Sequence, residues 1–301
     1  LRGRAGRQGD PGSSQFFVSL EDDLMRLFSS NRIVGYMDKL GHQEGDVIQH
    51  SIVTKAIERA QKKVEENNFG IRKRLLEYDD VMNSQREVIY KQRHNALMGE
   101  RIGVAVANNM LDVCEDIVET YKDVEDCAGF REDILRYLSV DFKIEEEDFK
   151  KKTRSELTHV LFKEVREVYE RKTQKIAAQA FPVIKNVFET KGNQYKNIVV
   201  PFTDGKRMYN VVSNLEKAYN TEGEDLIRSF EKAMILAHID NEWKEHLREM
   251  DDLKQSVQNA TYEQKDPLLI YKFESFNLFK EMIEKINKTV VSTLMKGQIP
   301  M

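Results

Sequence analysis

Cysteine, proline and tryptophan are scarce in this sequence, whose 301 residues include 2 Cys, 5 Pro and 1 Trp. Cys114 and Cys127 belong to no Cys-x-x-Cys or Cys/His pairing, which excludes a zinc knuckle and a disulfide framework and favours a reducing, cytosolic compartment. No proline lies between Pro11 and Pro182. Long helices are therefore permitted across that interval.

Long apolar runs and an excess of one charge are also missing. No run approaches the roughly 18 residues that a membrane span needs, and no basic-then-apolar leader opens the chain, so we expect a soluble protein. The chain has 47 lysines and arginines and 51 aspartates and glutamates, so its net charge is -4. Because no overall positive charge attracts nucleic acid, we expect no nucleic-acid partner. With 33% charged residues and a mean hydropathy of -0.59, the composition favours a mainly α fold of long solvated helices.

The sequence has no Gly-x-x-x-x-Gly-Lys-[Ser/Thr] motif, and so it contains no phosphate cradle of that type. We therefore expect this chain alone to bind no cofactor and to hydrolyse no ATP. Leu1 stands inside a glycine- and arginine-rich motif, and we interpret the chain as an excerpt of a longer protein.

The first hundred residues predict a loop, a strand and two helices. Glycines and Pro11 interrupt the start, and the short aromatic and β-branched segment 14–20 predicts a β-element. A helix is expected over 21–40. From Asp46 to about Leu97 the only glycine is Gly70, and apolar residues recur every three, four or seven positions. This pattern predicts one helix about 50 residues long, which at ~1.5 Å per residue would span on the order of 75 Å.

The middle of the chain predicts shorter helices and one hairpin. Helical stretches are expected at 104–121, 130–139, 147–179 and 181–188. Two β-rich runs near 195–212 flank Asp204-Gly205, which is a strong hairpin signal, and Pro201 would confine its strand to an edge.

The last eighty residues predict an antiparallel pair of long helices. The first covers about 224–257, and its stripe includes Trp243, which we interpret as a core residue. The second begins at Asp266-Pro267, a good N-cap followed by proline, and its expected packing stripe starts at Phe276. Tyr262 and Lys265 lie in the polar connection, where an exposed aromatic and a cation suit contact with a partner.

The segment best suited to a catalytic or binding role is the arginine-rich motif Arg2–Gly9. Planar guanidinium groups on a tight glycine loop can be aimed at a γ-phosphate, where they would stabilise charge during phosphoryl transfer. The alternative is a disordered basic tail that binds RNA. The folded pattern that follows favours the first interpretation.

Other clusters predict no catalytic or metal site. His238, Glu242 and His246 share a helix face, but three ligands over two turns reach one ion poorly, and we interpret them as a polar face of the helical pair. Asp79-Asp80 and Asp251-Asp252 are adjacent pairs, whose side chains point about 100° apart on a helix and cannot flank one bond.

Several segments together resemble one known family. Gly3–Ser14 running into Glu21–Arg26 closely resembles the end of the second motor domain of the SecA family of preprotein translocase ATPases. Within it, Arg4 and Arg7 fall on the arginines of superfamily-2 motif VI. The other similar segments are Ala60–Glu65 with Asn68-Phe69, Arg72-Lys73 with Leu75–Asn83, Gln85-Arg86 with Ile89-Tyr90, Trp243–Leu247 with Met250-Asp251, Gln264–Pro267 and Tyr271-Lys272.

This resemblance implies a division of the chain and a function. Residues 1–41 would be the edge of the second nucleotide-binding domain, 42–100 the long helix of the helical scaffold, 101–223 the helical wing domain, and 224–301 the scaffold continuation with the two-helix finger. The family couples ATP hydrolysis, with Mg, to moving preproteins through the SecYEG channel. It acts in the cytoplasm, peripherally associated with the inner face of the cell membrane.

The resemblance also assigns roles to single residues. Arg4 and Arg7 would sense the γ-phosphate, and Gly3, Gly6 and Asp10 would shape the nucleotide-binding loop. Tyr262 and Lys265 would contact the channel and the preprotein, and no metal ligand is expected. The partners implied are SecYEG, preprotein substrates, the N-terminal motor domain of the same chain, and a second copy in a homodimer.

Two other classes of function remain open at this stage. One is a helical interaction scaffold without motor activity. The other is an accessory region of a superfamily-2 nucleic-acid helicase, since motif VI is shared across that superfamily. The lack of a basic face interleaved with aromatic residues weakens the helicase alternative.

Overall fold

The computed structural model describes residues 4–15, 17–19, 22–24, 51–99, 101–192, 194–258 and 266–300. These residues are mainly helical, with one small antiparallel sheet, as the sequence predicts. No helix among them is long and apolar enough to cross a membrane. The main elements are α3 (Ser51–Met98), α4 (Ile102–Lys122), α5 (Cys127–Asp133), α6 (Glu146–Lys151), α7 (Arg154–Lys191), β1 (Asn197–Thr203), β2 (Met208–Asn214), α8 (Leu215–Asn220), α9 (Glu224–Gln258) and α10 (Pro267–Lys296).

The chain forms two units, Leu1–Asp80 and Val81–Met301. Helix α3 begins in the first unit and ends in the second, and its 48 residues continue through Gly70 without a break. The predicted long helix is thus confirmed from Ser51 onward, and 46–50 lie outside the described residues. Gly70 is tolerated because a single glycine costs a helix only about 1 kcal/mol relative to alanine.

In the first unit, the apolar face of α3 is buried at one end only. Ala56 and Ala60 pack with Val18 and Leu24, and Ala60 is fully buried. Further along, the expected apolar stripe is open to solvent, since Ile71 is 51% exposed and neighbouring apolar side chains are similarly open.

The expected strand at 14–20 is wrong for the part that the structure describes. Residues 14, 15 and 17–19 have no regular structure, and the only sheet among the described residues is β1–β2. A strand needs a neighbouring strand to satisfy its backbone N–H and C=O groups. No described strand pairs with these residues, and the backbone of Ser19 bonds to Asp22 instead. The helix expected at 21–40 lies outside the described residues except at 22–24, where Asp23 and Leu24 are helical.

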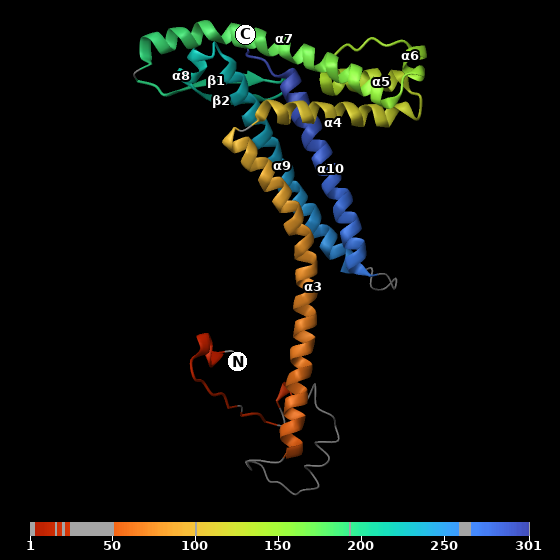
Figure 1. Ribbon diagram of the computed structural model, residues 1–301, viewed down its shortest axis with the longest axis vertical. Helices are drawn as coiled ribbons and strands as arrows, with labels where there is room; N and C mark the ends of the chain where they lie inside the picture. Colours follow the sequence, from red (N-terminus) through yellow and green to blue (C-terminus); the bar gives the residue numbers. More distant parts are fainter. Residues whose placement is uncertain are drawn as a thin grey trace. The chain divides into compact units, whose positions relative to one another are not determined.

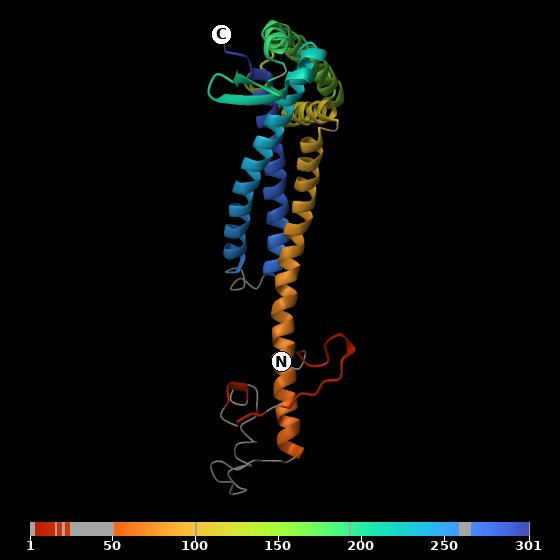
Figure 2. The same cartoon turned by 90° about the vertical axis from the view of Figure 1, so that its left-hand side faces the viewer.

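The second unit is built around one hydrophobic core shared by α4, α7, α9, α10 and the last turns of α3. Figures 1 and 2 show α9 and α10 side by side as an antiparallel pair, with α4 and α7 lying across one end of it. Helix α10 begins as predicted: Asp266 is its N-cap, and Oδ1 of Asp266 accepts the N–H of Leu268 at 3.0 Å.

Two predicted helix boundaries in the middle of the chain are wrong. The helix expected at 147–179 is two helices, because the Thr153 side chain and Glu156 form a reciprocal capping box that starts α7 afresh. The break expected before 181 is absent, since α7 continues through Pro182. The helix expected at 130–139 ends in a π-helical turn, Ile134–Leu138.

The predicted β-hairpin is confirmed. Strands β1 and β2 pair with Pro201 opposite Asn210, and with only two strands each has a free edge that tolerates proline. Phe202 is fully buried and stacks on Phe230 of α9 at a ring separation of 4.2 Å. Thr203 also pairs with Gln298 just after α10, which anchors the hairpin to the core.

Candidate functional site

The arginine-rich loop is a tight irregular turn in the first unit. Gly6 has φ +64°, and Arg7–Gly9 form a short 3-10 turn closed by the N–H of Asp10 donating to the carbonyl of Arg7 at 3.2 Å. Gly12 lies so close to the backbone of Gly6 that a Cβ there would collide with it. The backbone therefore requires glycine at position 12, and the positive φ of Gly6 favours glycine there.

This loop presents its arginines to solvent. Arg4, Arg7 and Asp10 are all exposed, and neither arginine has an ion-pair partner among the residues that the structure describes. Gly3 lies outside those residues. A rigid turn with two unpaired guanidinium groups can meet a phosphate, since arginine matches phosphate oxygens with paired N–H donors. The assigned roles of Arg4, Arg7, Gly3, Gly6 and Asp10 stay predictions.

In the second unit, polar side chains join the end of α3 to the helical pair. Arg93 donates to both carboxylate oxygens of Asp240, at 2.7 and 3.1 Å. About two turns before Arg93 on α3, Gln85 donates through Nε2 to the carbonyl of Ser275 at 3.0 Å. The Oε1 atom of Gln85 lies 2.9 Å from Nε2 of His246. We call Gln85, His246 and Ser275 the buried bridge, because each is less than 9% exposed.

On the helix face that carries the two histidines, His238 and Glu242 each contact a residue of α10. His238 Nε2 lies 3.1 Å from the hydroxyl of Thr293, and Glu242 is paired with Lys285 at 2.7 Å. No group of three potential ligands is found within the described ranges. Burial lowers the pKa of His246 to about 4, so its imidazole is neutral at pH 7.

Trp243 is a core residue, as predicted. Its side chain is 8% exposed and its ring lies 5.5 Å from that of His246. Met250 is also buried, and Leu247 packs against the same core.

The connection between α9 and α10, with Tyr262 and Lys265, lies outside the described residues. The predicted start of the packing stripe on α10 is wrong. Phe276 is 65% exposed and so does not begin that stripe. Leu269, Phe273 and Phe276 fall on one face at spacings of four and three, and all three are exposed. We call these three residues the α10 apolar face.

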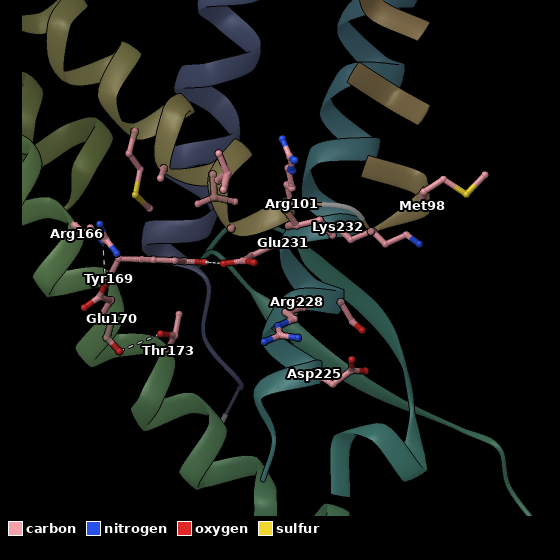
Figure 3. Close-up of a pocket in the computed structure, with 18 of the residues that line it drawn as sticks. Met98, Arg101, Arg166, Tyr169, Glu170, Thr173, Asp225, Arg228, Glu231 and Lys232 are labelled. Atoms are coloured by element: carbon pink, nitrogen blue, oxygen red, sulfur yellow. Dashed lines mark hydrogen bonds and ion pairs between the residues drawn. The ribbon is translucent and has the colours of Figure 1, made fainter. Parts of the chain in front are cut away.

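The second unit contains a large cavity that the sequence did not predict. It occupies about 1010 Å³ beside the start of α4, and α7, α8 and α9 complete its walls. Figure 3 shows Tyr169 and Glu231 pointing toward one another across it, with Arg228 and Asp225 further along α9. The Tyr169 hydroxyl donates to Glu231 at 2.8 Å. Its walls come from positions up to about 130 apart, so no local spacing could have revealed the cavity.

Comparison with known proteins gives the family. Residues 47–298 match the SecA wing and scaffold domain, and residues 1–45 match the SecA P-loop domain. The chain is 60% identical to the protein translocase subunit SecA of Christiangramia forsetii and 58% identical to those of Flavobacterium psychrophilum and Bacteroides fragilis. In each case all of this chain is covered, and it spans 27% of the relative. These matches favour neither of the two alternatives, an accessory region of a helicase and a helical interaction scaffold without motor activity. The chain belongs to the SecA family.

Proposed function

We propose that this chain is the C-terminal region of an ATP-driven protein translocase, which couples ATP hydrolysis to the movement of preproteins through the SecYEG channel. The observation that carries this proposal is the identity of 56–60% to SecA subunits over the whole chain. That similarity includes the loop where Arg4 and Arg7 stand free. In this proposal, the rest of the motor belongs to the part of a SecA subunit that this chain does not match.

ATP with Mg is the cofactor of the complete protein in this proposal. The exposed guanidinium groups of Arg4 and Arg7 suit contact with a γ-phosphate, and Gly6 and Asp10 flank the turn that contains Arg7. Gly3 is assigned to the same nucleotide-binding loop by the resemblance alone. ATP supplies the phosphoryl group, and the arginines would stabilise charge that develops on it. The phosphate cradle would belong to the N-terminal motor domain of the same chain, so 301 residues alone would hydrolyse no ATP.

The proposal divides the chain into four domains. Residues 1–41 form the edge of the second nucleotide-binding domain, 42–100 the scaffold helix, 101–223 the helical wing, and 224–301 the scaffold continuation with its two-helix finger. The capping box before α7 and the hairpin fall in the wing, and α9 with α10 makes the finger.

The end of the finger is the proposed contact with channel and substrate. Tyr262 and Lys265 stand between α9 and α10, and the α10 apolar face follows immediately. Exposed aromatic side chains on one helix face favour contact with a partner. The proposal places the protein in the cytoplasm, peripherally associated with the inner face of the cell membrane, with a homodimer as one assembly.

Replacing Arg7 by alanine in the complete protein tests the motor assignment. ATP turnover should fall by at least about a hundredfold while the Kd for a nucleotide changes little, because the arginine acts on charge formed in the transition state. Arg171→Ala, at an exposed position of α7, is the matched control and should leave turnover unchanged. Normal turnover by Arg7→Ala would refute the role of the loop.

A further inference from the structure

The arginine-rich loop is followed by a glycine that the proposed site roles do not include. Gly12 lies two residues after Asp10 and has no side chain that could meet a nucleotide. A Cβ atom at this position would lie 2.4 Å from the backbone nitrogen of Gly6 and 3.2 Å from the carbonyl carbon of Ala5. Backbone atoms cannot move aside as the end of a flexible side chain can. Residue 12 therefore passes directly against the backbone of residues 5 and 6.

This crossing closes the chain into a loop around Arg7. Gly6, Gln8 and Gly9 have φ values of 64°, 57° and 86°, and these left-handed conformations turn the chain back on itself. Arg7 stands inside the loop, between the two places where its arms meet at Gly6 and Gly12. The direction of the Arg7 side chain therefore depends on how the loop closes.

Packing does not fix the shape of this loop. The residues from Arg4 to Gln15 are all exposed, so no buried side chain anchors them. The hydrogen bond from the N–H of Asp10 to the carbonyl of Arg7, at 3.2 Å, fixes the turn locally but does not reach residue 12. The two arms of the loop can meet because residue 12 is a glycine.

We propose that Gly12 is a positioning residue for phosphoryl transfer, because the absence of a side chain lets the loop close and aim Arg7 at the γ-phosphate. This inference rests on the proposed role of Arg7. A side chain at position 12 would force the arms apart, and Arg7 would keep its charge but lose its direction. A displacement of about 1 Å can slow a reaction about a hundredfold. Binding of the nucleotide by the rest of the site would change little.

ATP turnover of the complete protein tests the proposal. Gly12→Ala should lower kcat by at least about tenfold and leave the Kd for ATP within about twofold, because the lost interaction forms only in the transition state. Gly103→Ala is the matched control. A Cβ at this exposed glycine of α4 meets no atom within 4 Å, so the variant should keep the original kcat.

A double variant separates positioning from an independent effect. If Gly12 acts through Arg7, then Gly12→Ala should lower kcat no further once Arg7 is alanine, and the double variant should match Arg7→Ala. Multiplied losses in the double variant would overturn the proposal. The melting temperature of Gly12→Ala should equal that of the original protein, because the loop is exposed. A fall in melting temperature together with kcat would also overturn it, in favour of a purely structural role.

The single variants tell a failure of this inference from a failure of the proposed function. Normal turnover by Arg7→Ala would refute the role of the arginine, and the positioning role would fall with it. A large loss of kcat in Arg7→Ala with normal kcat in Gly12→Ala would overturn the positioning role alone.

Discussion

The imidazole Nε2 of His246 lies 2.9 Å from Oε1 of Gln85, in a buried contact between α3 and α9. The carboxamide of Gln85 also donates to the carbonyl of Ser275 on α10, which fixes its oxygen toward the histidine. An amide oxygen only accepts, so Nε2 of His246 must carry the proton. His246 Nδ1 is then an acceptor, and it is buried without a partner among the described residues. One side chain of α3 therefore ties together both helices of the finger.

This bridge predicts that the second unit loses stability in mild acid. The pKa of His246 is lowered from 6.5 to about 4 by burial, so the unfolded chain takes up a proton between these pH values and the folded chain does not. Stability should therefore fall as the pH drops from about 6.5 to about 4, by about 2 kcal/mol. Urea unfolding followed by circular dichroism across this pH range measures the effect.

Two variants separate this histidine from the other titrating groups. His246→Gln should make the pH dependence between 4 and 6.5 shallower, because one histidine with a lowered pKa is gone, while His238, whose pKa burial also lowers, still contributes. His94→Gln, which changes an exposed histidine on α3, should leave the pH dependence intact. The same slope in His246→Gln as in the original chain would contradict the assignment.

Trp243 predicts a large effect on stability. Trp243→Ala should lower the free energy of unfolding by about 3–5 kcal/mol, because the indole is buried and its removal leaves a cavity. Phe276→Ala is the matched exposed aromatic and should cost less than about 0.5 kcal/mol. A loss below about 1 kcal/mol for Trp243→Ala would place the indole at a partner surface instead.

Local signals account for the parts of the fold that the sequence predicts. The long helix follows from its periodicity and lack of proline, the hairpin from Asp204-Gly205, and the start of α10 from Asp266-Pro267. Each of these depends on residues close together in the chain, where backbone preferences and turn geometry act directly.

The errors and omissions concern contacts between distant residues. Phe276 continues an apolar stripe, but a stripe does not say how far the partner helix extends, and this ring is exposed. The bridge from Gln85 to His246 spans 161 positions, and the cavity unites several elements, so neither leaves a local pattern. The strand expected at 14–20 is absent at the described residues 14, 15 and 17–19, because strand pairing depends on two segments and the sequence motif describes only one.

Pro182 predicts a stabilising substitution. It stands in the interior of α7, where it removes one N–H from the helix and crowds the preceding turn. Pro182→Ala should raise the free energy of unfolding by about 1 kcal/mol, because alanine restores the N–H and removes the crowding. Denaturant unfolding compares the two proteins, and a fall in stability would show that packing of the proline ring outweighs the helix defect.

The end of the finger predicts a separation of transport from stability. Tyr262→Ala in the complete protein should lower channel-coupled preprotein transport severalfold, because an aromatic side chain in this polar connection can stack on an extended peptide of any sequence. Phe273→Ala, on the exposed α10 apolar face, should act in the same direction, while both variants keep basal ATP turnover and melting temperature. Tyr195→Ala, which changes an exposed tyrosine before β1, is the matched control and should transport normally. Reduced stability with normal transport in Tyr262→Ala would instead mean that this ring folds back to cap the core between α9 and α10.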